Sequence, residues 1–291
     1  MTLLSAFGYR PNKKKPIKVA SHISPQRVSV VIPVKNNQAG ITRFLSLLPK
    51  VMPLEQRPLE VIVVDNNSDQ PLSLPQEYPL PLKLAQCMPI GPAAARNVGV
   101  DLAKGEWVLF TDSDCIPTAN MVSGYSTDQN RFVAYAGGID IISNDLLSRY
   151  YRGQETLIPR EAKYSERLAP DYLVTANCLV QKTAIEHIGG FDSRFKQAGG
   201  EDIDLAFRLL EIGDLAYQFN SVTVHEFDDG FNGFVKRFQR YGRGVRQLAD
   251  KYQLDFKPRP FLPTKLTLPN LGLAFIEYVA YATGYAKGGL K

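Results

Sequence analysis

The sequence predicts an α/β fold in which a mostly parallel sheet is flanked by helices and followed by a C-terminal helical extension. Two continuous β-branched runs, Val28–Val34 and Leu59–Asp65, are typical of strands buried on both faces of a parallel sheet. Between them, apolar residues recur at helical spacing from Gly40 to Val51. Together the three segments predict a βαβ unit.

The same alternation continues along the chain. Leu82–Gln86 is predicted as a short strand, and Gly91–Ala103 as a helix that leads into the apolar strand Glu106–Asp114. Ligands of open α/β sheets bind beyond the carboxyl ends of the strands. We therefore expect one ligand site at three such ends, marked by Pro33, Asp65 and Asp112.

The strand Glu106–Asp114 ends in two carboxylates one residue apart. Because successive side chains of a strand point to opposite faces, Asp112 and Asp114 are expected to share a face while Ser113 turns away. Two carboxylates on one face can hold Mg²⁺ or Mn²⁺ and the phosphates that the ion binds. An acidic pair at a strand end can also simply solvate a turn, so the spacing alone decides nothing.

Composition limits the classes of partner. With 291 residues, 44% of them hydrophobic, the chain can form one large α/β domain with an appendage. Its 34 Lys and Arg residues against 29 Asp and Glu residues suit anionic nucleotides or membrane surfaces. No nucleic-acid motif accompanies this charge. The three widely spaced cysteines argue against a disulfide framework or a zinc knuckle and favour a reducing cytoplasm.

Six motifs, in one order across residues 27–226, resemble those of the family 2 glycosyltransferases. They are Val30–Val34, Glu60–Ser68, Ala94–Gly99, Phe110–Asp114, Gly189–Phe195 and Gly200–Leu209. Together they are far more specific than any one of them. The resemblance implies the GT-A fold, which is a Rossmann-like, mostly parallel sheet flanked by helices. It also implies that the donor substrate is a nucleotide-diphosphate sugar, and we expect the nucleotide to be UDP.

The resemblance assigns the donor site to the strand ends. It makes Asp65 a uracil-binding carboxylate and Pro33 and Val34 the first wall of the base pocket. The alternatives are a hydrogen-bonded turn at Asp65 and a proline that merely terminates the strand. The other residues assigned to the nucleotide-sugar are Asn67, Arg96, Asp112 and Ser113. Arg96, near a helix start, is expected to reach the nucleotide or Asp112 rather than a surface neighbour.

The resemblance also places a metal site for Mn²⁺ or Mg²⁺ at Asp114, Asp112 and His225. In the family pattern the second aspartate contacts the metal, and the first binds the ribose or reaches the metal through water. A divalent ion neutralises the charge that develops on the departing diphosphate. His225 ends the predicted strand Ser221–His225, where it can instead cap the strand or pair with Glu226.

Two further carboxylates begin a predicted helix over residues 201–212. Asp202 matches the catalytic base of the family, and Glu201 is expected to orient the base or the acceptor. A helix start stabilises an ionised carboxylate, as an inverting transfer requires, although acidic residues there often only complement the helix dipole. Asp204 and Arg208 are predicted as a supporting ion pair.

Three segments are expected: a flexible basic arm, a GT-A catalytic domain and a C-terminal helical extension, over residues 1–25, 26–228 and 229–291. The extension is expected to contact the acceptor, a membrane surface or a second copy of the chain. An apolar stripe with basic residues opposite it, over residues 231–252, predicts a helix that lies in a membrane interface or packs on the catalytic domain. After a proline-rich link, Leu271–Ala286 is too short to span a bilayer and is expected to dock, dimerise or rest on a membrane.

We therefore expect a cytoplasmic, metal-dependent, inverting glycosyltransferase of the hexosyl- or N-acetylhexosaminyl-transferase class. A homodimer and a peripheral contact with the inner face of a membrane stay open, as does the acceptor: a saccharide, a lipid-linked group, a peptide or a small metabolite. One alternative is a non-catalytic nucleotide-sugar binding module. The other, a nucleotidyltransferase, normally has a Gly-rich, Arg-containing loop where this chain has Pro33–Asn37.

Overall fold

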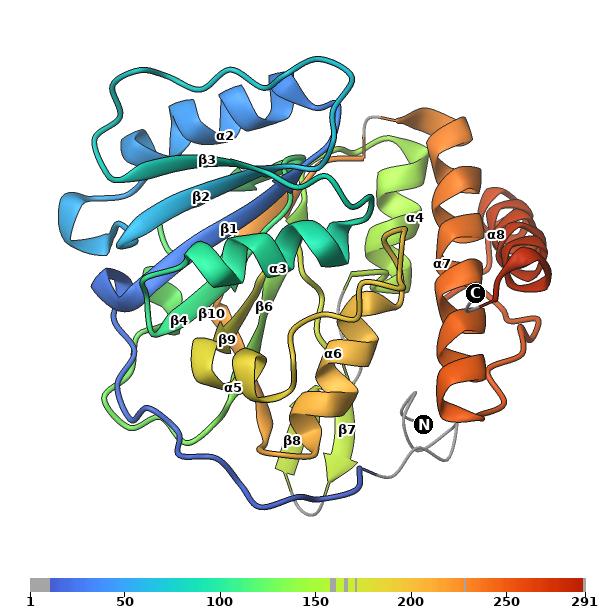
Figure 1. Ribbon diagram of the computed structural model, residues 1–291. Coiled ribbons are helices and arrows are strands. Elements are labelled where there is room, and N and C mark those ends of the chain that lie inside the picture. The colour runs from blue at the N-terminus through green and yellow to red at the C-terminus, as the bar shows by residue number, and fades with distance from the viewer. Residues whose placement is uncertain (1–10, 158–160, 165–166, 171, 228, 290–291) are drawn as a thin grey trace.

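The structure, a computed structural model, describes residues 11–157, 161–164, 167–170, 172–227 and 229–289 (Figure 1). Its α-helices are α2 (Gln38–Val51), α3 (Pro92–Leu102), α4 (Leu146–Gln154), α5 (Lys182–His187), α6 (Glu201–Leu210), α7 (Gly230–Tyr252) and α8 (Leu268–Lys287). Its strands are β1 (Val28–Val34), β2 (Glu60–Asp65), β3 (Leu82–Gln86), β4 (Trp107–Phe110), β5 (Cys115–Pro117), β6 (Ala134–Ile141), β7 (Glu161–Tyr164), β8 (Arg167–Pro170), β9 (Cys178–Gln181) and β10 (Leu215–His225). Short 3-10 helices are η1 (Pro25–Arg27), η2 (Leu54–Gln56) and η3 (Ser123–Tyr125).

An eight-stranded sheet organises the molecule. Over the described ranges its strand order is β3-β2-β1-β4-β9-β6-β10-β5, with four parallel and three antiparallel pairings. In β1, Val30 lies opposite Val61 of β2 on one side and Leu109 of β4 on the other, both in parallel register. The apolar runs therefore form adjacent parallel strands, which confirms the predicted sheet.

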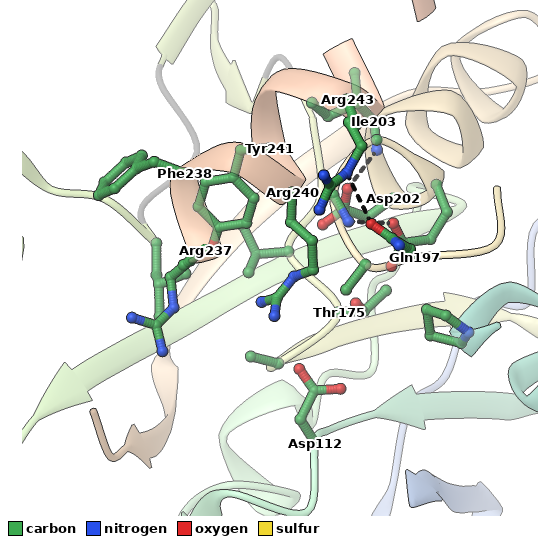
Figure 2. A pocket seen from close by; sticks show the side chains of 18 of the residues that line it. Asp112, Thr175, Gln197, Asp202, Ile203, Arg237, Phe238, Arg240, Tyr241 and Arg243 are labelled. Atoms are coloured by element: carbon green, nitrogen blue, oxygen red, sulfur yellow. Dashed lines mark hydrogen bonds between the residues drawn. The ribbon is translucent and has the colours of Figure 1, made fainter. Parts of the chain in front are cut away.

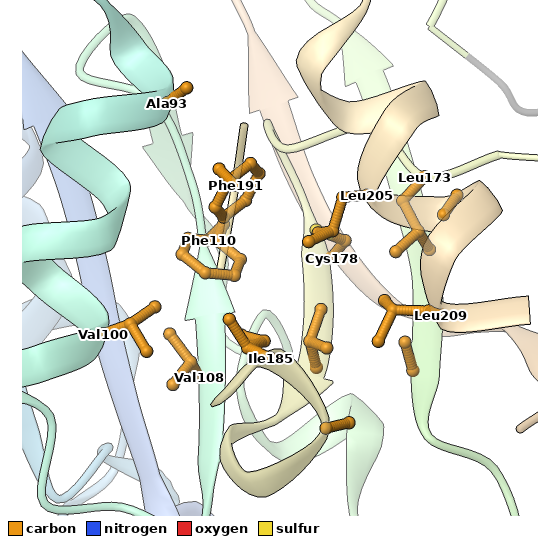
Figure 3. Packing of buried hydrophobic residues seen from close by; sticks show 14 of the residues in the cluster. Ala93, Val100, Val108, Phe110, Leu173, Cys178, Ile185, Phe191, Leu205 and Leu209 are labelled. Carbon is orange, nitrogen blue, oxygen red and sulfur yellow. The ribbon is translucent and has the colours of Figure 1, made fainter. Parts of the chain in front are cut away.

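Helices cover both faces of this sheet (Figure 1). Because neighbouring strand residues point to opposite faces, Val31 packs in the core cluster that includes α3 and α6, whereas Val30 packs in the one that includes α2. Figure 3 shows Phe110 of β4 among side chains from the first cluster. Strands buried on both faces explain why the runs are continuously apolar rather than alternating.

The strand that leads to the two aspartates is shorter than predicted. β4 ends at Phe110, and Asp112 and Asp114 lie in a turn closed by the Cys115 N–H, which donates to the Asp112 carbonyl at 3.1 Å. The prediction that strand alternation places both carboxylates on one face is therefore wrong. The parallel ladder with β1 stops at the pair Val31 and Phe110, and the Asp and Ser residues that follow favour a turn.

The C-terminal helices α7 and α8 pack along each other. Phe234 and Phe238 of α7 are buried in a cluster that includes Tyr150 and Tyr151 of α4 as well as Leu273 of α8. At these positions the apolar stripe packs on the preceding domain, as the packing alternative predicts. A Cβ at Gly242 would lie only 2.0 Å from the Tyr281 carbonyl oxygen, so glycine permits this close approach of the backbones. In the described part of the chain, no helix is long and apolar enough to cross a bilayer.

From Lys14 onward, the N-terminal segment is attached to the domain that contains the large sheet. The backbone N–H groups of Lys14 and Ile17 donate to the carbonyls of Glu211 and Ile212 at 2.7 and 3.2 Å, and Ile23 is buried. From Lys14 to residue 25, the segment expected to be a flexible arm thus lies against the domain. Residues 1–10 of that expected arm lie outside the described residues.

Candidate active site

A cavity of about 1080 Å³ opens at the carboxyl ends of β1 and β4. The strand ends, the start of α6, and helices α7 and α8 form its walls, and Figure 2 shows residues that line it. Nine of the residues predicted for the site line this one cavity: Pro33, Val34, Arg96, Asp112, Ser113, Asp114, Glu201, Asp202 and His225. The topology thus gathers these side chains from widely separated parts of the sequence.

Two predicted donor residues, Asp65 and Asn67, lie outside the described lining of this cavity. Asp65 is buried, and one of its oxygens accepts the Ser68 N–H at 3.0 Å, which is the turn interaction weighed as the alternative. Asn67 is exposed with φ 58°, a conformation that Asn tolerates in turns. Its neighbour Asn66 lines the cavity instead, and its side chain accepts the Gly91 N–H at 2.9 Å. Uracil binding by Asp65 stays a prediction.

Arg96 links two carboxylates of the site. Its side chain is 2% exposed, and its N–H groups donate to Asp112 at 2.8 Å and to Glu201 at 2.9 Å. The second Glu201 oxygen accepts the Gly199 N–H at 2.7 Å. The predicted contact between Arg96 and Asp112 is confirmed, and the surface alternative for Arg96 is wrong. A guanidinium buried between two carboxylates fixes the orientation of both.

Asp114, His225 and Cys115 have ligand atoms that lie within 4.8 Å of one another. The Nδ1 atom of His225 lies 2.9 Å from the Glu226 carbonyl oxygen, and its Nε2 atom lies 3.4 Å from Asp114. Donation from Nδ1 to that carbonyl leaves the Nε2 lone pair facing the carboxylate. The Asp114 Oδ1 atom is buried without a hydrogen-bond partner among the described residues. This carboxylate and imidazole therefore fit a divalent ion such as Mn²⁺.

Asp202 is a half-buried titratable group at the start of α6. Desolvation, followed by the neighbouring Glu201 charge, raises its pKa to about 7, although Arg96 acts in the opposite direction. The expectation that the helix start makes ionisation easier is therefore wrong, because burial and a like charge outweigh the helix terminus. A carboxyl group with a pKa near neutrality can accept and release a proton in the physiological range.

The ion pair predicted within α6 is present. Arg208 lies 2.7 Å from Asp204, whose side chain is fully buried. The Tyr252 hydroxyl donates to the same carboxylate at 2.8 Å, and Lys251 forms a second ion pair with it. Because Tyr252 and Lys251 belong to the end of α7, these bonds tie that helix to the helix that carries Asp202.

Helix α7 supplies cations that the sequence interpretation did not place in the site. They are Lys236, Arg237, Arg240 and Arg243. Arg237 donates to Asp229 at 2.8 Å, whereas the Nε atom of Arg240 is buried without a hydrogen-bond partner in the described part of the chain. Figure 2 shows the Arg240 guanidinium pointing toward Asp112. The basic face of α7 was visible in the sequence, but the direction in which it turns was not.

Comparison with known proteins identifies the family. The sequence model of Glycosyl transferase family 2 matches residues 29–189, which is more than half of the chain. The chain belongs to glycosyl transferase family 2. Membership favours sugar transfer over the nucleotidyltransferase alternative and confirms the predicted resemblance.

One curated relative of this family 2 glycosyltransferase is the pre-mycofactocin glycosyltransferase of Mycobacterium tuberculosis. The two are 28% identical over 239 residues, which cover 79% of this chain and 49% of the relative. The chain therefore spans about half the length of that relative.

Two solved glycosyltransferase structures share the fold of this family 2 chain. GalNAc-T7 with UDP, GalNAc and Mn²⁺ is 17% identical with a TM-score of 0.59, covering 81% of this chain and 50% of that one. The mannosyltransferase PcManGT from Pyrobaculum calidifontis, in complex with GDP-Man and Mn²⁺, is 19% identical with a TM-score of 0.54, covering 94% and 77%. These neighbours confirm the predicted GT-A fold.

Proposed function

We propose that this family 2 glycosyltransferase is a metal-dependent, inverting enzyme that transfers a sugar from a UDP-sugar to an acceptor hydroxyl group. The observation that carries the proposal is the cavity that holds Asp114, His225 and Asp202 together. The two structural neighbours, solved with UDP or GDP-Man and with Mn²⁺, support a nucleotide and a divalent ion in this fold.

The strand ends form the donor side of the proposed site. Asp114 and His225 would hold the divalent ion, which when bound supplies Lewis-acid stabilisation of the diphosphate. Asp112, oriented by Arg96, is available to a ribose hydroxyl. Arg240 faces Asp112 with an unpartnered Nε atom, so it can neutralise charge that develops on the diphosphate oxygens as the sugar departs.

Asp202 is the proposed base. Its ionised carboxylate takes the proton of the acceptor hydroxyl while that oxygen forms a bond to the anomeric carbon, and the bond from this carbon to the diphosphate breaks on the opposite face. UDP leaves with the bonding electrons, and the anomeric configuration is inverted without a covalent enzyme intermediate. Glu201, held by Arg96 and the Gly199 N–H, fixes the backbone that presents Asp202.

Donor hydrolysis distinguishes this function from a non-catalytic nucleotide-sugar binding module. The protein is incubated with Mn²⁺ and, separately, with UDP-glucose, UDP-galactose, UDP-GlcNAc, UDP-GalNAc and GDP-mannose, and mass spectrometry detects the released nucleotide. We expect UDP release from at least one UDP-sugar, its loss in EDTA, and its loss in Asp202→Asn but not in Asp128→Asn, since Asp128 is 89% exposed outside the cavity. Binding without release would identify a binding module, and hydrolysis of GDP-mannose alone would contradict the UDP assignment.

A further inference from the structure

The wall of the cavity that α8 forms carries a carboxyl group that the proposed chemistry does not use. Glu277 lines the cavity, as do Tyr281 on the same helix and Phe261 in the segment before it. Glu277 and Tyr281 are four residues apart, so their side chains lie on one face of α8. The cavity therefore offers a carboxyl group and two aromatic rings, on a different part of the chain from the donor residues.

The carboxyl group of Glu277 has one hydrogen-bond donor among the described side chains. The Tyr150 hydroxyl donates to its Oε2 atom at 2.7 Å, and burial raises its pKa to about 7. In the described part of the chain no cation pairs with it, and the buried α8 residues around it include Leu273 and Ala280. Retaining a half-buried acid without a counter-ion costs stability. Such a group in the wall of a catalytic cavity is a candidate for ligand recognition.

The charges around the cavity select the class of ligand. Lys236, Arg240 and Arg243 line the same space, and they would repel a cationic acceptor. The negative charge of the Glu277 carboxylate would in turn repel an anionic group placed beside it. Neutral hydroxyl groups avoid both conflicts, because they donate hydrogen bonds to a carboxylate oxygen without bringing charge. The aromatic rings of Tyr281 and Phe261 supply the apolar surface that small-molecule sites combine with a few polar groups.

Resting on the proposed transferase function, we propose that Glu277, Tyr281 and Phe261 form the acceptor subsite and that the acceptor is a neutral saccharide. Glu277 accepts hydrogen bonds from hydroxyl groups of the sugar ring, and the aromatic rings cover its apolar face. Glu277 and Asp202 line one cavity, so a saccharide held at α8 can direct another of its hydroxyl groups toward the base.

Saturation-transfer NMR with soluble sugars tests this subsite. The probes are methyl β-glucoside, cellobiose and N,N′-diacetylchitobiose as neutral sugars, glucosamine as a cation and glucose 6-phosphate as an anion, each added to the full chain with UDP and Mg²⁺. We expect at least one neutral sugar to bind and its affinity to fall roughly tenfold to hundredfold in Glu277→Ala. Glu277→Gln, which keeps a hydrogen-bond acceptor, should lose less.

Matched controls separate recognition from folding. Asp255→Asn changes an exposed carboxylate outside the cavity and should leave sugar affinity unchanged. A thermal melt of Glu277→Gln should show an equal or higher Tm than the unaltered chain, because the half-buried acid without a counter-ion is costly. A purely structural Glu277 would show a lower Tm.

Three results would overturn the subsite: no neutral sugar binds the unaltered protein, neutral sugars bind it and Glu277→Ala equally well, or only glucosamine binding responds to Glu277→Gln. UDP titration of the same samples reports on the proposed function separately. If UDP binds and UDP-sugars are hydrolysed while the sugar test fails, the acceptor assignment alone is lost. If UDP does not bind the unaltered protein, the transferase proposal fails whatever the sugars do.

Discussion

Arg96 and Glu201 form an ion pair whose nitrogen and oxygen atoms lie 2.9 Å apart, and each of the two side chains is only 2% exposed. The pair joins α3 to the start of α6, and a second N–H of Arg96 reaches Asp112. One guanidinium thus couples the donor-side aspartate to the helix that carries the proposed base. The geometry of both halves of the site depends on it.

Arg96→Met should destabilise the fold strongly. The substitution removes the counter-ion and leaves the Glu201 carboxylate buried, a change that typically costs about 3–5 kcal/mol. Chemical denaturation measures the free energy of unfolding. Arg27→Met is the control, because its pair with Glu106 is 41% and 48% exposed and pairs of that kind contribute about 0–1 kcal/mol. Equal losses in the two variants would contradict a structural role for the buried pair.

The sequence predicted the sheet because strands buried on both faces have continuous β-branched runs, and Val28–Val34 is such a run. It assigned Asp112 and Asp114 to the strand rather than to the turn that follows, because nothing in the local pattern marks where the ladder between β1 and β4 stops. The position of Asp202 at a helix start predicted a carboxyl group that ionises easily. That prediction failed because the desolvation that raises the pKa of Asp202 arises only when the cavity is assembled.

The same limit applies to the C-terminal helices. The basic face of α7 was apparent in the sequence, but whether Arg240 faces the cavity depends on how α7 packs. That packing involves the contacts of Lys251 and Tyr252 with Asp204 of α6. In the sequence, Glu277 indicated only that a charged residue interrupts an apolar segment. Its place in the cavity wall follows from the close packing of α8 on α7, which Gly242 permits.

Asp114→Ala should abolish metal-dependent turnover without unfolding the protein. Asp114 supplies an unpartnered buried oxygen beside His225, so its loss removes a ligand and should lower UDP release by on the order of 10²-fold or more. Electron paramagnetic resonance with Mn²⁺ measures ion binding directly, and thermal melts report on folding. Asp128→Ala is the matched control for losing a carboxylate. Full turnover of the unaltered protein in EDTA would refute the metal assignment.

Arg240→Gln should weaken the binding of UDP by about tenfold and barely affect uridine. The reason is that the guanidinium points toward Asp112, two residues from the proposed metal ligand Asp114, so we expect it near the diphosphate rather than the base. Isothermal titration calorimetry with both ligands measures the difference. Arg246→Gln, on the same helix but paired with Asp250 at 2.8 Å, should bind both ligands normally. A parallel loss of uridine and UDP affinity would argue against a phosphate contact.

Glu277 should make stability depend on pH. Its pKa rises from the ordinary 4.5 to about 7 through burial, with Tyr150 of α4 as its hydrogen-bond donor. The folded state therefore holds this proton more tightly than the unfolded state. The stability it contributes is fully present below about pH 4.5 and is lost as the pH rises through about 7. Glu277→Gln should gain Tm relative to the unaltered protein across that interval, and a constant Tm difference would show that the group does not titrate as described.

Asp202→Asn should stop transfer while leaving donor binding intact. The amide keeps the size of the side chain but cannot take the proton of the acceptor, so transfer should fall by roughly 10²–10⁴-fold. UDP titration measures donor binding, and NMR of the anomeric proton reads the product of the unaltered enzyme. An α-linked UDP-sugar should give a β-linked product, and retention of the donor configuration would exclude Asp202 as an inverting base.

The pH profile provides the most direct test of Asp202. Because desolvation and Glu201 raise its pKa to about 7, the ionised, active base is scarce in acid. Below neutrality the transfer rate should rise roughly tenfold per pH unit, and it should level off above about pH 7. The acceptor must be saturating, so that the titration of Glu277 does not enter the measured rate. Asp202→Glu should retain a sloping profile with a displaced midpoint, whereas the residual activity of Asp202→Asn should lose the slope. A slope that survives in Asp202→Asn would assign the titration, and with it the proton transfer, to another group in the cavity.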